Sequence, residues 1–191
     1  MYISSILLKK FYTDEQQIHV ALMSCFDSKR EKFNILYKKK IIEASDGDIA
    51  LSLLVYSDVQ PVSSRTADVD VSLFIEPEKS IYQGQALGFS VIANPCRKHN
   101  GRKYTISDSG ERCEWIIKKM SEGGADVMEK TLQEKKLPTI HLEHSYGKSF
   151  IPASCFTGVL RVTDLSKFLD LFHRGLGSAK AYGCGLIELR G

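Results

Sequence analysis

One histidine has a side chain and a position that suit proton transfer. His19 follows Thr13-Asp14-Glu15-Gln16, which fits a helix-capping box with Thr13 as N-cap and Gln16 at the third helical position. The predicted helix gathers its apolar side chains on one face: Ile18, Ala21, Leu22, Cys25 and Phe26. His19 lies roughly 100° around the helix from Ile18, at the edge of that face. It can therefore reach a cleft and accept or donate a proton there, although a lone helical histidine is more often structural.

A glycine-rich loop is the second candidate. It reads Gly175-Leu176-Gly177-Ser178-Ala179-Lys180-Ala181-Tyr182-Gly183-Cys184-Gly185. A dinucleotide-binding loop follows a strand and opens a helix, whereas a predicted helix precedes this loop and a strand follows it. A P-loop needs Gly-Lys-Ser/Thr, which is absent. The remaining functional interpretation is a backbone that lies close to phosphates at Gly175, Gly177 and Gly183, with charge from Lys180. The alternative, a helix C-cap followed by a tight turn, stays open.

The densest group of basic residues is a candidate phosphate-binding loop. It reads Arg97-Lys98-His99-Asn100-Gly101-Arg102-Lys103, with four full positive charges and no acid. Such clusters bind phosphates and make affinity depend on salt, although a solvated loop is an equally good interpretation. A further cation, Lys148, is the one positive charge in the segment 139–148.

Two pairs of residues could suggest a metal ion. His141 and His144 are three positions apart, so in a strand they point to opposite faces. Asp68 and Asp70 share a face if that stretch is extended, and paired carboxylates can hold Mg²⁺. Two carboxylates on a surface segment more often only solvate it. We therefore expect no metal and no cofactor.

Composition sets wider limits on the function. Hydrophobic residues make up 43% of the 191 residues, and 26 Lys and Arg against 23 Asp and Glu leave a net charge of +3. This weakly basic balance permits a polyanionic partner without arguing for one. No apolar run approaches the length of a membrane span. The five cysteines are scattered and odd in number, which is typical of free thiols in a reducing cytoplasm.

The elements that must position these residues follow one order twice. Strands are predicted at 2–9, 31–38, 49–57 and 84–93, with the His19 helix after the first and a poor helix candidate at 64–70. In the second half a strand at 97–106, a helix at 109–121, two or three strands within 125–163, a helix capped by Asp164 and a strand at 186–189 repeat it. This β-α-β-β-α-β order predicts an α+β fold of two tandem ferredoxin-like, or RRM-like, domains, at 1–94 and 95–191.

Several segments together resemble the CasE family of CRISPR-associated endoribonucleases of type I-E systems. The glycine-rich loop, continued to Leu189, resembles the family's C-terminal signature. Four other segments agree in order along the chain: Met1-Tyr2-Ile3-Ser4, Gln17-Ile18-His19-Val20-Ala21-Leu22, Phe89-Ser90-Val91-Ile92-Ala93-Asn94-Pro95 and Phe156-Thr157-Gly158-Val159-Leu160. The resemblance spans nearly the whole chain.

The resemblance implies a specific activity. The protein would bind the hairpin of CRISPR repeat RNA, cleave it at its 3′ base, and stay on the product as a subunit of the Cascade complex. His19 matches the family's catalytic histidine, and cleavage would proceed without metal, by attack of the ribose 2′-hydroxyl. Some members carry a catalytic tyrosine one turn earlier, where this chain has Gln16. Gln16 can support the reaction only by hydrogen bonding, so a paired tyrosine would have to come from Tyr2, Tyr12 or Tyr182.

Two other functions remain in view. A protein of the same fold could hold the RNA hairpin within Cascade and cleave it weakly or not at all, because Gln16 is no general acid. A pair of ferredoxin-like domains could also bind a small metabolite, in which case the basic residues would be incidental and RNA affinity absent.

Overall fold

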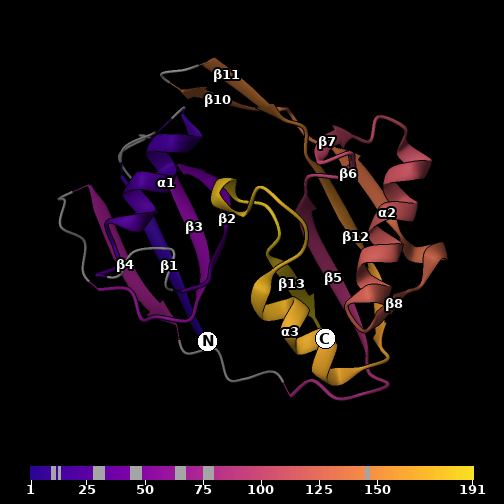
Figure 1. Ribbon diagram of the computed structural model, residues 1–191. Helices are drawn as coiled ribbons and strands as arrows, with labels where there is room; N and C mark the ends of the chain where they lie inside the picture. The colour runs from indigo at the N-terminus through magenta and orange to yellow at the C-terminus, as the bar shows by residue number, and fades with distance from the viewer. Residues whose placement is uncertain are drawn as a thin grey trace. The chain divides into compact units, whose positions relative to one another are not determined.

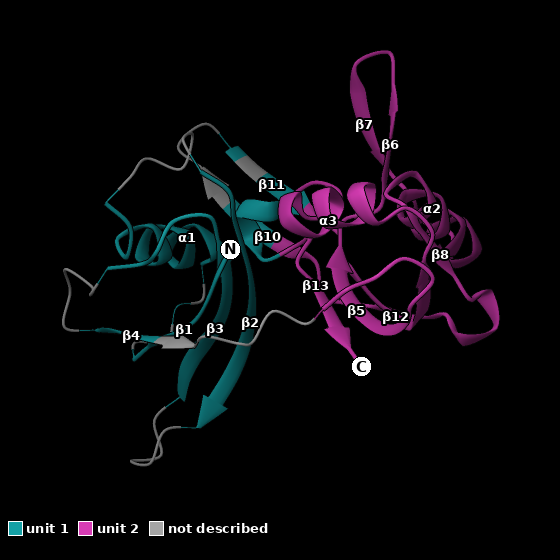
Figure 2. Ribbon diagram, turned by 90° about the horizontal axis from the view of Figure 1, so that it is seen from below, with its two compact units in different colours: residues 1–78, 141–150, 180–183 teal, residues 79–140, 151–179, 184–191 magenta. Residues whose placement is uncertain are grey.

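The computed structural model describes residues 1–9, 12, 14–27, 33–43, 49–62, 68–74, 80–144 and 147–191. Figure 1 labels its helices and strands. The chain divides into two compact units, which Figure 2 distinguishes by colour. Unit 1 consists of Met1–Glu78, His141–Phe150 and Lys180–Gly183, and unit 2 consists of Lys79–Ile140, Ile151–Ala179 and Cys184–Gly191.

Unit 1 is built on a four-stranded antiparallel sheet. Its strands are β1 (Tyr2–Leu8), β2 (Ile35–Glu43), β3 (Ile49–Ser57) and β4 (Val69–Phe74), in the spatial order β2-β3-β1-β4. Helix α1 (Glu15–Met23) connects β1 to β2. This is the strand order of a ferredoxin-like domain, with β3 between the two strands that α1 connects. The weak helix predicted at 64–70 falls largely on 63–67, outside the described residues, and its end belongs to the turn at Asp68 and to β4.

Helix α1 begins one residue later than predicted. Its N-cap is Asp14, whose side chain accepts a hydrogen bond from the Gln16 backbone N–H at 3.0 Å. The prediction of Thr13 as N-cap was therefore wrong, because the Asp14 carboxylate already satisfies that N–H group; Thr13 itself lies outside the described residues. All five residues of the predicted apolar face pack with the sheet in one core: Ile18, Ala21, Leu22, Cys25 and Phe26. The helix itself ends at Met23, so the prediction was wrong in placing Cys25 and Phe26 on it; they lie in the segment that follows.

Unit 2 repeats the same topology. Its sheet has the order β13-β5-β12-β8, formed by β13 (Ile187–Arg190), β5 (Ala86–Ala93), β12 (Ser154–Val162) and β8 (Ala125–Val127), with β9 (Gln133–Lys136) also paired to β12. Helices α2 (Ser109–Glu122) and α3 (Leu165–Arg174) cover one face of this sheet (Figure 1) and contribute Ile116, Met120 and Phe168 to its core. The α+β class and the ferredoxin-like topology of both halves are confirmed.

One strand belongs to a different sheet from the one expected. The strand predicted at 84–93 was assigned to the N-terminal domain, but β5 pairs with β12 and β13 and so is the first strand of the second sheet. The periodicity of a strand does not identify its partners. The fourth strand of the first sheet is β4, which pairs with β1. In place of a division at residue 94, we propose a domain boundary between β4 and β5.

Two hairpins stand apart from the sheets. The segment predicted as a single strand at 97–106 forms the hairpin of β6 (Cys96–His99) and β7 (Arg102–Thr105). Its turn places Asn100 at φ 48° and Gly101 at φ 76°, the positive pair that a two-residue hairpin favours. The second hairpin joins β10 (Ile140–His144) and β11 (Gly147–Ile151). The described residues also include two 3-10 turns, η2 (Glu129–Thr131) and η3 (Lys180–Tyr182).

The predicted ends of α3 are confirmed. Asp164 caps its N-terminus by accepting a hydrogen bond from the Lys167 backbone N–H at 3.1 Å. Gly175 ends the helix at φ 73°, and its N–H bonds to the Leu171 carbonyl at 2.8 Å. A left-handed φ favours glycine, so the first residue of the glycine-rich loop has a structural reason to be glycine.

Candidate active site and nucleic-acid interface

His19 lies on α1 where the buried face meets solvent. Its side chain is half-buried, while Ile18 before it is only 1% exposed and Val20 after it is exposed. The helix therefore packs through Ile18 and presents His19 at the margin, as the helical wheel predicted. A half-buried imidazole can meet a bound substrate without the helix leaving its sheet.

The imidazole of His19 has an aromatic neighbour from a distant part of the chain. The ring of Tyr182 lies with its centroid 6.5 Å from that of His19, at an interplanar angle of 59°. Tyr182 is the last residue of η3, which contacts α1 and β2 within unit 1 and appears in Figure 1 as the yellow turn beside β2. A phenol hydroxyl and an imidazole thus share one small region of unit 1.

A buried tyrosine holds η3 in this position. The hydroxyl of Tyr37, on β2, donates a hydrogen bond of 2.9 Å to the Ala181 carbonyl, and the Tyr37 side chain is 0% exposed. Gly183 follows η3 at φ 78°, where a Cβ would lie 3.4 Å from Cε2 of Tyr37. Glycine is required there by backbone conformation and is closely packed as well. Sequence reasoning did not single out Tyr37, because nothing local marks a strand tyrosine as the anchor of a distant turn.

A partly buried ion pair lies one helical turn before His19. Glu15, in the first turn of α1, pairs with Lys39 of β2, and its side chain is 9% exposed. Its other oxygen, Oε2, is buried with no hydrogen-bond partner. Residues four apart lie on the same side of a helix, so a carboxylate sits on the His19 side of α1. The sequence analysis used Glu15 only as part of a capping box.

The two residues expected to support His19 lie in different elements of unit 1. Gln16, half-buried, is three positions before His19 on α1 and is thereby its neighbour on the helix surface. Tyr2 opens β1 opposite Ser57 and is 45% exposed. Their roles remain predictions.

The part of the glycine-rich loop that belongs to unit 2 is fixed by several contacts. Gly177, at φ 77°, faces the indole of Trp115, whose Cη2 would lie 3.3 Å from an added Cβ. Ser178 Oγ donates to Asn94 Oδ1 at 3.1 Å. The loop closes through the Leu176 N–H on the Gly185 carbonyl at 2.9 Å. These contacts give Gly177 a structural role, whether or not a phosphate approaches it.

Ala179 and Lys180 connect this fixed segment to η3. Ala179 has φ 62° without being glycine. Backbone held in such regions costs on the order of 1–3 kcal/mol and tends to occur at functional sites. Lys180 is the first residue of η3, and its side chain is half-buried. It belongs to unit 1, as Tyr182 and His19 do.

The basic segment at 97–103 forms a two-stranded hairpin in unit 2. In β6–β7, Lys98 faces Lys103 and His99 faces Arg102, and all four are exposed. Like charges directly opposite one another destabilise a hairpin. Arg97, also exposed, forms an ion pair with Glu111 at 3.4 Å. The hairpin is anchored to α2 because Trp115 Nε1 donates to the Cys96 carbonyl at 3.1 Å.

In the β10–β11 hairpin two aromatic rings are in contact. His141 packs edge-on against Phe150, with ring centroids 5.1 Å apart, and Phe150 is 60% exposed. Lys148 lies in β11, but its side chain is outside the described part of the structure. Its role in RNA binding remains a prediction.

The residues weighed as metal ligands show no third partner. Asp70, in β4, forms an ion pair with Lys9 at 3.0 Å, and Asp68 lies in the preceding turn. Throughout the described ranges, no three His, Cys, Asp or Glu side chains are grouped so that they could hold a metal ion.

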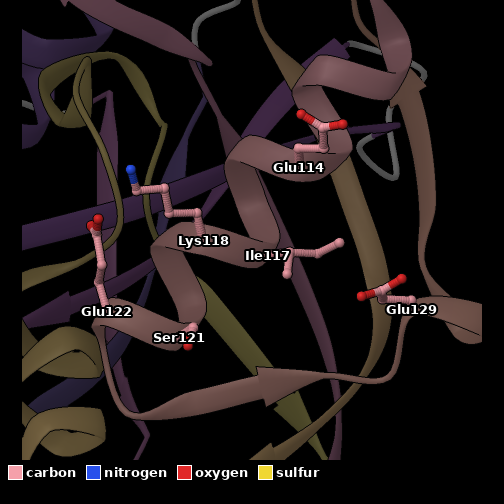
Figure 3. A pocket seen from close by; sticks show the side chains of 6 residues that line it. All are labelled: Glu114, Ile117, Lys118, Ser121, Glu122 and Glu129. Atoms are coloured by element: carbon pink, nitrogen blue, oxygen red, sulfur yellow. The ribbon is translucent and has the colours of Figure 1, made fainter.

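A groove along α2 has the wrong charge for a polyanion. It has a volume of about 540 Å³ and is lined by Glu114, Ile117, Lys118, Ser121, Glu122 and Glu129 (Figure 3). Three of these side chains are carboxylates. A hydrogen bond from Lys119 at 2.6 Å holds the pKa of Glu122 below its usual value, so that carboxylate stays ionised. This groove therefore cannot be the phosphate-binding surface.

In the described residues, no helix is both long and apolar enough to cross a membrane.

The two units and their candidate residues indicate the class of protein to which this chain belongs. Two ferredoxin-like units, one with a half-buried histidine and the other with a basic hairpin, make this an RRM-like double-domain protein. The family described as CRISPR associated protein matches residues 1–190, and the chain belongs to it.

Individual relatives agree with that membership. The chain is 25% identical over 201 residues to the CRISPR system Cascade subunit CasE of Escherichia coli strain K12, which covers 99% of this chain and 98% of that protein. It is 29% identical over 118 residues to the CRISPR-associated endoribonuclease Cse3 of Thermus thermophilus, covering 56% of each. A solved structure of the CRISPR endoribonuclease Cse3 bound to a 19-nucleotide RNA shares the fold, with a TM-score of 0.84 at 19% identity over the whole of both chains.

Proposed function

We propose that this protein is a metal-independent endoribonuclease that processes CRISPR repeat RNA. It binds the repeat hairpin, cleaves at the 3′ base of that hairpin to give mature crRNA, and remains with its product as a subunit of Cascade. The observation that carries the proposal is the half-buried His19 on α1, with Tyr182 beside it, in a chain that belongs to the CRISPR-associated family. The relatives named as CasE and as Cse3 endoribonuclease support the same activity.

The chemistry needs a base and a source of one proton. The 2′-hydroxyl attacks the adjacent phosphorus and His19 accepts the proton that this hydroxyl loses, while the bond between phosphorus and the 5′-oxygen breaks and the leaving oxygen takes up a proton from an acid or from water. The products are a 2′,3′-cyclic phosphate and a free 5′-hydroxyl. An imidazole can perform this proton transfer near neutral pH without a metal-bound hydroxide.

The β6–β7 hairpin is proposed to hold RNA phosphates. Lys98 opposite Lys103 is an unfavourable pair of like charges in the free protein. RNA phosphates bound to these side chains remove the repulsion, and the RNA releases its counterions. Lys180, Gly175, Gly177 and Gly183 are proposed to contact the backbone of the same RNA, since glycine permits close approach.

An RNA-binding Cascade subunit with little cleavage remains the second candidate. It is favoured by Gln16, whose amide cannot donate a proton as an acid does. We place either activity in the cytoplasm, where the transcript is made. The cysteines are consistent with that compartment, since all five are free thiols.

The decisive experiment is single-turnover cleavage of the repeat hairpin in EDTA. Wild-type protein should cut and leave a 2′,3′-cyclic phosphate, and an RNA with 2′-deoxyribose immediately 5′ of the cut should bind but stay intact. His19→Ala should slow cleavage by on the order of 10² to 10⁴ with nearly unchanged affinity. Wild-type cleavage by His19→Ala would overturn the proposed mechanism. Equal losses of binding and cleavage would favour the binding subunit.

A further inference from the structure

The site needs a second proton-transfer group besides His19, and the one carboxylate on the His19 side of α1, Glu15, is already engaged in an ion pair with Lys39. An RNA cleavage that leaves a 5′-hydroxyl requires a base for the 2′-hydroxyl and an acid for the departing 5′-oxygen. His19 is suited to one of these roles. Gln16, its neighbour one turn earlier, carries an amide that can form hydrogen bonds but cannot transfer a proton.

Tyr182 is placed to be that group. Its ring centroid is 6.5 Å from that of His19, and the two rings are inclined at 59°, so they are neighbours without stacking. The Tyr182 side chain is half-buried, as is that of His19, so each can meet solvent or substrate.

The position of Tyr182 is set before any RNA binds. Its turn is fixed by the Tyr37 hydroxyl on the Ala181 carbonyl at 2.9 Å, next to Tyr182 in sequence. Gly183, on the other side of Tyr182, adopts φ 78° against the Tyr37 ring. A catalytic group held by contacts of its neighbours needs little reorganisation during the reaction.

From this geometry we propose that Tyr182 is the general acid that protonates the 5′-oxygen, with His19 as the general base. The inference rests on the proposed ribonuclease function and deepens it. His19 takes the proton of the 2′-hydroxyl while the 2′-oxygen forms a bond to phosphorus. The bond between phosphorus and the 5′-oxygen breaks, and the Tyr182 hydroxyl gives its proton to that oxygen. The phenolate then regains a proton from the His19 imidazolium through water, which restores both residues.

A phenol is chemically suited to this task. It is protonated at neutral pH, and it is a stronger acid than the ribose alcohol that leaves, so proton transfer to the 5′-oxygen is downhill as the bond breaks. An amide at position 16 cannot substitute for it. The chain can therefore lack a tyrosine on α1 and still hold a complete acid–base pair.

The test uses Tyr182→Phe, which removes one oxygen and keeps the ring. On the repeat hairpin, the single-turnover rate should fall by on the order of 10², with hairpin affinity unchanged. Tyr82→Phe is the matched control, because Tyr82 is an exposed tyrosine, 61% accessible, on unit 2, and it should cut at the wild-type rate.

A second substrate distinguishes an acid from a positioning residue. With sulfur in place of the 5′-bridging oxygen, the leaving thiolate needs no proton, so Tyr182→Phe should cleave this RNA as fast as wild type. That recovery would also show that the variant is folded. His19→Ala should stay slow on both substrates, because loss of the base is not repaired by a better leaving group.

Each outcome decides a separate question. If Tyr182→Phe cut the ordinary hairpin at the wild-type rate while His19→Ala was slow, the inference would be overturned and the ribonuclease proposal would stand. If Tyr182→Phe was slow on both substrates, Tyr182 would not be the acid.

Discussion

The β6–β7 hairpin gives a prediction whose size follows from its contacts. Replacing Arg97, Lys98, Arg102 and Lys103 together by alanine should weaken hairpin binding and reduce its dependence on salt. Each phosphate contact contributes roughly 0.7 to 0.9 to the slope of log K against log salt. Four contacts would therefore lower the slope by roughly 2.8 to 3.6. The Arg97–Glu111 ion pair competes with one of them, so three contacts, worth roughly 2.1 to 2.7, are the lower bound.

The assay is a titration of labelled repeat hairpin at several salt concentrations. Between 50 and 200 mM salt, the ratio of wild-type to variant affinity should shrink by roughly 20- to 150-fold. The control removes the same charge elsewhere on unit 2, with Lys118, Lys119, Lys130 and Lys167 changed to alanine, and should keep the wild-type slope. An unchanged slope in the hairpin variant would show that β6–β7 does not contact RNA. Equal flattening in both variants would show an effect of net charge alone.

Three further predictions concern the loop, the helix and the core. Lys180→Ala should weaken RNA binding in a folded protein, whereas Gly177→Val should also lower stability, because its Cβ meets Trp115 at a positive φ; equal unfolding midpoints for the two variants would contradict this. Gln16→Tyr should leave cleavage unchanged or raise it, and a large loss with intact circular dichroism would give Gln16 its own role. Arg112→Ala should lower the free energy of unfolding by about 3 kcal/mol, because it leaves the buried Glu134 carboxylate without its partner at 2.9 Å. Burial raises the pKa of Glu134, but hydrogen bonds led by that from Arg112 lower it below 4.5 overall. The stability that the pair contributes is therefore present above pH 4.5 and is lost as pH falls through the lowered pKa. Urea unfolding across that pH range should show that the free energy of unfolding depends less on pH in Arg112→Ala than in the wild type.

Local patterns predicted the parts of this protein that local physics decides. The apolar stripe of α1, the edge position of His19, the Asp164 cap and the Gly175 end of α3 all depend on residues within a few positions of one another. The assignment of β5 failed because a strand's periodicity is the same whichever sheet it joins. Tyr182 was one of three tyrosines considered, and its place beside His19 depends on Tyr37 and Ala181, which are 144 positions apart. A pattern read over a short stretch of sequence cannot reveal a contact between residues so far apart.

The composition of unit 1 has a consequence for when the protein becomes active. Helix α1 and strands β1 to β4 of unit 1 are synthesised first, yet Lys180–Gly183 also belong to unit 1 and are made after nearly all of unit 2. A nascent chain can therefore assemble the His19 helix and its sheet while the tyrosine of the pair has not yet been made, since early segments fold as they emerge. If the pair acts as proposed, a partly synthesised chain can fold without being able to cut. The nuclease is then silent during translation and is switched on by the segment that arrives late.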